Sequence, residues 1–245
     1  MDNFKNLILV ILICAALSVL YFNLALDPAS IDKLFLTIST FLFSIFSGFF
    51  ISRQAARYSD IRKSLAAIDG NMSAMYRASG HLGADFQSKV GGVIKEYYEL
   101  ILKNQSWDYN FTHKTTTLIS LHALLEERVG KNSLSPLEGS ALGRVTASLG
   151  NIQMERKNLV ALYEERIPFF QWAPIYFLAT VLFITLSITV PSFDFLLPSI
   201  LKGAFATAII VVLILLRQLD SLRLFEGIIG EHSAKDVIEI IEGDK

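Results

Sequence analysis

The amino-acid sequence predicts an all-α membrane protein, with four transmembrane helices and a large helical cytoplasmic insertion between spans two and three. Three observations support this prediction: the composition, the clustering of apolar residues, and the placement of basic residues. Of the 245 residues, 52% are hydrophobic and 18% are charged, and the mean hydropathy is +0.46. Ordinary soluble domains carry about 25% charged residues. A chain with so few charges cannot cover its apolar surface with polar side chains, so we expect lipid to cover part of it.

The same composition excludes several other classes of protein. With 22 basic and 23 acidic side chains the formal net charge is -1, which offers no bulk attraction to nucleic acid. The single cysteine, Cys14, excludes an intramolecular disulfide and a cysteine cluster for zinc or iron–sulfur. The high apolar content excludes a disordered chain.

Four apolar stretches are long enough, or nearly long enough, to cross a hydrocarbon core, which takes about 20 helical residues. They are residues 7–26, 34–51, 169–190 and 200–216. The first exceeds the roughly 7–15 apolar residues of a signal peptide, and no small-residue cleavage site follows it before Asp27. We therefore expect it to be retained as a span. Lys202 lies at the leading edge of the fourth stretch, and its long side chain can extend to the membrane interface.

The basic residues predict the orientation, because cytoplasmic loops of membrane proteins are enriched in Lys and Arg. Such residues follow span two, precede span three and follow span four: Arg53, Arg57, Arg62, Lys63, Arg156, Lys157, Arg166, Arg217 and Arg223. The short connections 27–33 and 191–199 contain a single basic residue, Lys33. We expect residues 52–168, the C-terminal segment 217–245 and both termini to face the cytoplasm.

The insertion, residues 52–168, has a helical pattern throughout. Apolar residues recur at helical spacing from Ile61 to Tyr76, which continues span two into the insertion. Residues 103–111 predict a loop, and Thr112 is expected to open a helix that ends at Gly130. Ser135, Pro136 and Glu138 form a capping-box pattern with proline at the first helical position. The insertion is therefore expected to be a helical bundle that is continuous with membrane helices at both ends.

Two short stretches support a family resemblance. Span two ends in Ser47-Gly48-Phe49-Phe50-Ile51-Ser52-Arg53, an aromatic, glycine-containing run that leads into a basic segment. Span four is followed by Leu219–Gly227, which contains Asp220 and Glu226. These stretches and the order of spans resemble the bestrophin-like family of bacterial membrane proteins and, more distantly, the bestrophin anion channels. The arginine–tryptophan–tryptophan signature of bestrophins is absent, and only Asp220 and Glu226 remain of their acidic calcium clasp.

The resemblance implies an oligomeric, chloride-type anion channel in the bacterial inner membrane, most simply a homopentamer, with the bilayer and the permeant anion as its partners. Phe41, Ile45 and Phe49 would then form the apolar neck of the pore. Arg53 and Arg57 would lie at the cytoplasmic mouth, and Asp220 with Glu226 would form the acidic motif after span four. From the residues themselves we expect no cofactor, no nucleic-acid partner and no enzymatic activity, since the net charge is near zero and no Gly-x-Ser-x-Gly elbow or comparable catalytic frame occurs.

Other interpretations of the same residues stay open. Phe41, Ile45 and Phe49 could face lipid or pack between helices, and the basic residues after span two could serve only as a topology anchor. The whole chain could be a membrane-anchored interaction or signalling module, or an effector that permeabilises membranes. His113, His122 and Glu126 could be metal ligands only if further ligands joined them, since the paired Glu/His motifs of di-iron bundles are missing.

The orientation gives a first testable prediction. In a Cys14→Ser background, cysteines introduced at Ser106 and Ser133 should resist an impermeant thiol reagent in intact cells, because both lie in the predicted cytoplasmic insertion. A cysteine at Ser192, in the second short connection, should be labelled. Labelling of Ser106→Cys or Ser133→Cys in intact cells would contradict the orientation.

Overall fold

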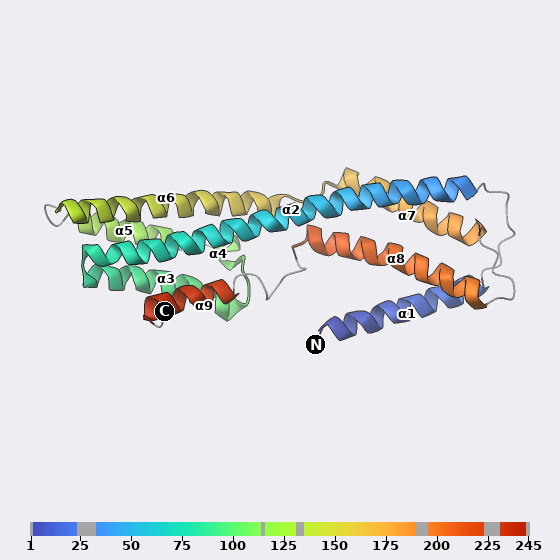
Figure 1. Cartoon of the computed structure of the whole chain (residues 1–245), viewed down its shortest axis with the longest axis horizontal. Helices are drawn as coiled ribbons and strands as arrows, with labels where there is room; N and C mark the ends of the chain where they lie inside the picture. Colours follow the sequence, from blue (N-terminus) through green and yellow to red (C-terminus); the bar gives the residue numbers. More distant parts are fainter. Residues whose placement is uncertain are drawn as a thin grey trace. The chain divides into compact units, whose positions relative to one another are not determined.

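The computed structural model describes the chain as an array of helices joined by short segments (Figure 1). The described residues are 2–23, 33–113, 116–130, 135–189, 196–222 and 231–243. The helices are α1 (Asp2–Asn23), α2 (Lys33–Ser79), α3 (Ala84–Asn104), α4 (Tyr109–Thr112), α5 (Thr117–Val129), α6 (Pro136–Glu164), α7 (Phe169–Thr189), α8 (Leu196–Asp220) and α9 (Glu231–Glu242), with a 3₁₀ turn, η1 (Gly80–Leu82). No strand occurs among the described residues, as the sequence predicts.

The chain divides into two compact units. Unit 1 comprises residues 1–55 and 166–221, and unit 2 comprises residues 56–165 and 222–245. Helix α2 is a single uninterrupted helix of 47 residues that begins in unit 1 and ends in unit 2.

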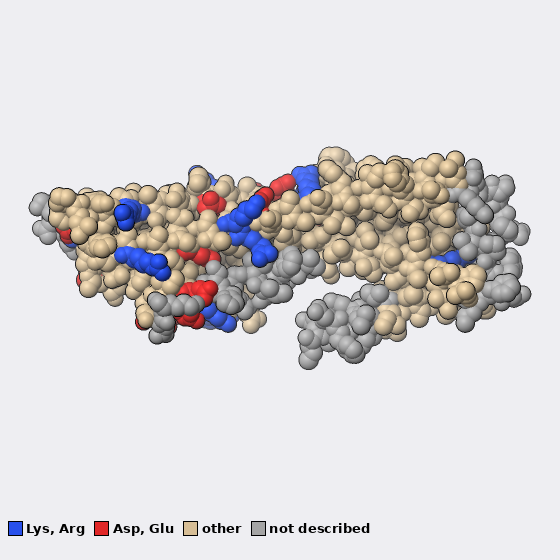
Figure 2. Space-filling view, viewed as in Figure 1, with Lys and Arg blue, Asp and Glu red and all other residues tan. Residues whose placement is uncertain are grey.

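Unit 1 is built around an apolar core shared by α2, α7 and α8. The core residues are Phe43, Phe50, Ile167, Trp172, Ile175, Ala179, Leu182, Ile209 and Leu216. Much of the remaining surface of these helices is also apolar, and the part of unit 1 visible in Figure 2 carries few charged side chains. Apolar side chains both inside and outside a helical unit are the pattern of a membrane domain.

Three helices in this unit are long and apolar enough to span a bilayer: the apolar part of α2, which begins at Leu34, together with Phe169–Ile188 and Leu197–Asp220. They coincide with predicted spans two, three and four. Within α1 the residues with described side chains give a shorter apolar stretch, Ile11–Phe22. The first span, and with it the four-span topology, therefore stays a prediction.

Helix α1 packs closely on α8 at Gly203. A Cβ atom added at Gly203 would lie 2.9 Å from the backbone nitrogen of Ser18 and 3.0 Å from the backbone oxygen of Cys14, and nearer still to the Ser18 hydroxyl. Tyr21 then packs with apolar residues of α7 and α8 in a second small cluster. Small residues at such crossings let helix backbones approach in lipid, so Gly203 sets the position of α1.

Unit 2 is a helical bundle with its own apolar interior. Residues of α2, α3, α5 and α6 that are almost completely buried form this interior: Ile61, Ile68, Met72, Met75, Val90, Ile94, Tyr98, Leu121, Leu149 and Leu159. The α2 members are those that the helical spacing after span two predicts. Helix α9 packs on α3 and adds the C-terminal segment to this bundle. There the Tyr76 hydroxyl donates to the Ile241 carbonyl (3.0 Å), and Lys95 pairs with Glu242 (2.6 Å).

The capping box that opens α6 is confirmed. The Glu138 backbone N–H donates to the Ser135 hydroxyl, and the Glu138 carboxylate accepts from the Ser135 N–H at 2.9 Å. The bond from the Ser135 backbone N–H to the carboxylate is the main cause of a lowered pKa of the Glu138 carboxyl. The helix expected to begin at Thr112 was wrong at its start. Residues Tyr109–Thr112 form the separate turn α4, and α5 begins at Thr117.

The close crossing at Gly203 leads to a prediction about stability. Because the added methyl group would meet backbone atoms that cannot rotate away, Gly203→Ala should lower the free energy of unfolding by about 1–3 kcal/mol, the usual cost of overpacking. Denaturant titration of the protein in mild detergent would measure it.

Gly143→Ala is the matched control, because a Cβ atom at Gly143 meets no atom within 4 Å. That variant should be at least as stable as the original chain, since alanine favours a helix over glycine by about 1 kcal/mol. Equal stability of the two variants would contradict the close approach of α1 to α8.

Candidate functional site

One face of α2 packs into unit 1. Its buried residues in the membrane half and the turn that follows are Ser39, Phe43, Ser47, Phe50 and Gln54. They are spaced three or four apart, so they form a single stripe along the helix. Phe43 and Phe50 belong to the core shared with α7 and α8. This stripe fixes which side of α2 faces the rest of unit 1.

Phe41, Ile45 and Phe49, the predicted neck residues, lie outside this stripe. Their exposed fractions are 64%, 50% and 60%. At about 100° of rotation per residue, Phe41 and Ile45 lie within about 20° of the direction opposite to the buried stripe, and Phe49 lies about 60° from it. The ring of Phe49 also makes an edge contact with Phe50, at 5.3 Å between centroids. Packing in the protomer's own core therefore does not explain Phe41 and Ile45.

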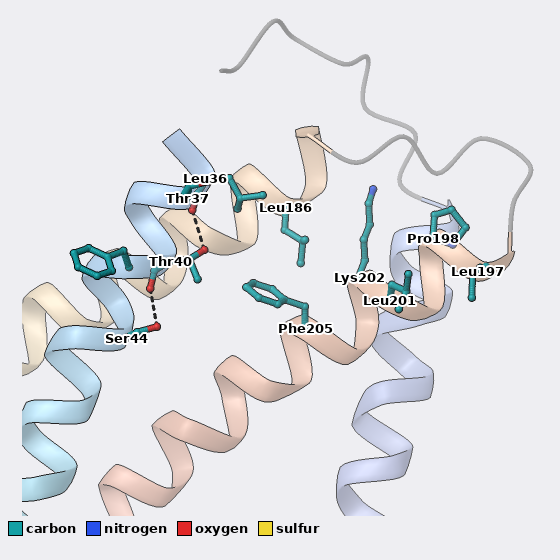
Figure 3. Close-up of a pocket in the computed structure, with 11 residues that line it drawn as sticks. Leu36, Thr37, Thr40, Ser44, Leu186, Leu197, Pro198, Leu201, Lys202 and Phe205 are labelled. Carbon is teal, nitrogen blue, oxygen red and sulfur yellow. Dashed lines mark hydrogen bonds between the residues drawn. The ribbon is translucent and has the colours of Figure 1, made fainter. Parts of the chain in front are cut away.

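Beside this face is an open, largely apolar pocket of about 770 Å³ (Figure 3). Residues of α2, α7 and α8 line it: Leu36, Thr37, Thr40, Phe41, Ser44, Leu186, Leu197, Pro198, Leu201, Lys202 and Phe205. Phe41 thus forms part of the pocket wall, whereas Ile45 and Phe49 do not belong to its lining.

Two of the three hydroxyl groups on this wall, those of Thr40 and Ser44, are bonded to their own helix. Thr40 donates to the Leu36 carbonyl and Ser44 to the Thr40 carbonyl, each at 2.8 Å. Figure 3 shows both bonds as dashed lines along α2. Because the hydroxyl hydrogens are committed to the backbone, the two oxygens present acceptor lone pairs to the pocket.

Lys202 is the single cation among the described residues that line the pocket. The expectation that its side chain can extend to the membrane interface stays a prediction. In the structure the side chain is 1% exposed and lies on the α8 wall beside Leu201 and Phe205 (Figure 3). Its ammonium lies 5.7 Å from the centroid of the Tyr21 ring, a cation–π contact between α8 and α1. Lys202 therefore contributes to the packing of α1 against α8.

The two arginines predicted at the cytoplasmic mouth have different surroundings. Arg53 is exposed on α2. Arg57 is buried, and its guanidinium donates to the carbonyls of Leu162 (2.6 Å) and Tyr163 (2.9 Å) at the end of α6. The last carbonyls of a helix lack partners within it and carry partial negative charge. Arg57 thus holds the C-terminus of α6.

Asp220, from the acidic motif after span four, is also engaged in internal contacts. Its carboxylate accepts from the Ile167 backbone N–H at 2.7 Å and from the Gln54 side-chain amide at 3.4 Å. Asp220 therefore joins the end of α8 to the segment before α7 and to α2. Glu226, its predicted companion, lies outside the described residues.

Gln54 also lies on the buried stripe of α2, although no role was predicted for it. It is 2% exposed and follows Ser47 and Phe50 on the buried stripe of α2. A polar residue that continues an apolar helix face at helical spacing indicates a buried hydrogen bond, so the signal was present in the sequence.

The histidines considered as metal ligands are not gathered into a site in the part of the chain that the structure describes, where no group of three or more His, Cys, Asp or Glu could hold a metal ion. Instead, His122 shares a hydrogen bond of 2.7 Å with the Gln153 side chain.

Comparison with known proteins places this arrangement in a family. No curated protein and no solved structure matches the chain. The model of the bestrophin-like domain matches residues 7–230, which include all of α2, α7 and α8 and the intervening helices of unit 2. The match confirms the resemblance that the stretches after spans two and four indicated. With nearly its whole length covered, this membrane protein belongs to the bestrophin-like family.

Proposed function

We propose that the chain assembles into a homo-oligomeric anion channel of the chloride type in the bacterial inner membrane, most simply a pentamer, in which α2 lines a central pore. The observation that supports this proposal best is the apolar face of α2 turned away from its own unit. Membership of the bestrophin-like family supports it independently.

The geometry of unit 1 favours a ring. A pore through a single protomer would have to pass between α2, α7 and α8, but apolar core residues of all three helices pack together there. The face that carries Phe41 and Ile45 stays outside that core. In a closed ring each copy can present the same face to a common axis, so that each residue becomes a ring of identical side chains.

Such rings would act as an apolar neck. Hydrophobic constrictions in channels control conduction because water leaves them readily and an ion must then give up part of its hydration shell. Ile45 is the strongest neck candidate, because it points almost directly away from the buried stripe. Unlike the two phenylalanines, it neither lines the pocket nor packs against another aromatic side chain of the protomer. Phe41 also lines the pocket, and Phe49 also contacts Phe50.

At the cytoplasmic end we assign Arg53 to the mouth of the pore, where repeated positive charge would concentrate anions. Arg53 lies one turn beyond Phe49 and is exposed. We assign Arg57 and Asp220 to the structure of the protomer, because both side chains bond backbone groups at helix ends. In this proposal both termini and residues 52–168 are cytoplasmic, as the basic residues indicate.

Assembly gives the next prediction. Native mass measurement of the detergent-solubilised protein should show a closed oligomer larger than a dimer, because in the proposed ring the α2 faces of several copies meet at a common axis. A monomer over a wide range of protein concentration would contradict the channel and favour a membrane-anchored interaction module.

Anion flux through liposomes tests the neck. In the triple variant Phe41→Ala/Ile45→Ala/Phe49→Ala, halide flux per oligomer should rise, or the channel should lose its gating, because smaller side chains widen the constriction and keep it wet. The loss of protomer stability should stay below the roughly 3–5 kcal/mol of a buried Phe→Ala change, since these side chains are exposed within the protomer.

A matched control truncates exposed apolar residues of α7 in Phe169→Ala/Phe177→Ala/Ile184→Ala, whose side chains are 88%, 67% and 55% exposed. Its flux should equal that of the original chain. Unchanged flux in an intact α2 triple variant would remove these residues from the pore. Absence of halide flux in the original protein would contradict the channel, and leakage of a large dye would indicate a membrane-perturbing effector.

A further inference from the structure

A second pocket lies within unit 2, where the last turns of α2 and η1 meet α6. Its volume is about 480 Å³. Side chains from these three elements line it: Ala74, Arg77, Ala78, His81, Arg144, Ala147, Ser148 and Asn151. The Asn151 amide donates to the Asn71 side chain at 3.2 Å, which ties α6 to α2 beside the pocket. The lining is therefore held by packed helices rather than by loops.

The lining is basic. It contains two guanidinium groups and an imidazole, and no carboxylate occurs among the described residues around it. Some other cations of unit 2 form ion pairs, as in Lys95–Glu242 and Arg128–Glu138, both at 2.6 Å. Neither Arg77 nor Arg144 forms an ion pair with any part of the described chain. Two like charges that share one pocket repel each other, so binding of an anion would relieve this repulsion.

The other lining groups indicate which kind of anion fits. Three alanines in the lining have short side chains, and Ser148 adds a hydroxyl from a buried position. Guanidinium groups match phosphate oxygens in geometry and bind them through paired N–H bonds. No Phe, Tyr or Trp occurs in the described lining, so the pocket offers no aromatic platform for a nucleobase.

We propose that this pocket binds the phosphate group of a small phosphorylated solute, with Arg77 and Arg144 as the principal contacts and His81, Ser148 and Asn151 as additional hydrogen-bonding groups. The site lies entirely in unit 2, so it does not depend on the chain conducting ions.

The test uses the full-length protein in detergent, with inorganic phosphate and pyrophosphate as probes and with ionic strength held constant by chloride. Isothermal titration should show saturable binding, tighter for pyrophosphate than for phosphate and tighter for both than for sulfate. In Arg77→Gln/Arg144→Gln the pyrophosphate affinity should fall about tenfold or more, because two charged hydrogen-bonding contacts are lost.

The matched control is Arg62→Gln/Lys157→Gln, which removes the same total charge from exposed positions on the same two helices, α2 and α6. Its pyrophosphate affinity should change less than twofold, within the scatter of surface-charge effects. A second variant, Ala147→Glu, places a carboxylate at an exposed position of the lining and should abolish binding while Arg77 and Arg144 stay intact.

Three results would overturn the proposal. One is equal loss of affinity in the control and in the arginine pair, which would show diffuse charge attraction. Another is undiminished binding in Ala147→Glu. The third is pyrophosphate binding no tighter than sulfate binding at the same ionic strength.

Discussion

The face that α2 offers to its neighbours is the constraint on which unit 1 depends. In lipid, apolar surface gives little drive for helices to associate, so close packing and a few polar contacts decide which faces meet. The stripe from Ser39 to Gln54 combines small residues, which let helices approach, with two phenylalanines that fill the space towards α7 and α8. Once this stripe is buried, the rigid helix must direct Phe41 and Ile45 outwards.

Polar residues near the ends of the membrane helices stabilise this packing by hydrogen-bonding backbone groups at helix ends. In hydrocarbon or a protein core an unpaired backbone group costs several kcal/mol, by an order-of-magnitude estimate. Asp220 satisfies the Ile167 N–H just before α7, and Arg57 satisfies the last carbonyls of α6. Loss of either charged side chain would therefore destabilise the protomer whether or not ions pass nearby. Mutation of Asp220 or Arg57 is for this reason a poor test of conduction.

The apolar pocket described in unit 1 and the basic pocket described in unit 2 differ in the side chains that line them, so they suit different ligands. The pocket of unit 1 is apolar apart from Lys202 and three hydroxyl groups, of which those of Thr40 and Ser44 are bonded to their own helix. The pocket of unit 2 presents two arginines, a histidine and small side chains. Helix α2 contributes residues to both, Thr40 and Ser44 to the first and Arg77 to the second, and it does so as one unbroken helix.

The helical class, spans two to four, the capping box of α6 and the family were all predictable from the amino-acid sequence. These depend on local properties: the length of an apolar run, the spacing of residues along a helix, and turn chemistry within four residues. The start of α5 was missed because α4 forms a separate turn that the polar composition of residues 103–111 concealed. Which face of α2 is buried was settled by the packing of whole helices, since apolar residues occur all round that helix and periodicity cannot distinguish contact with lipid, with the core or with a partner. That packing also decided that Arg57 and Asp220 bind backbone groups far away in the sequence, and that Arg77 and Arg144 share a pocket. Contacts of that kind depend on how separate helices pack, which no local pattern records.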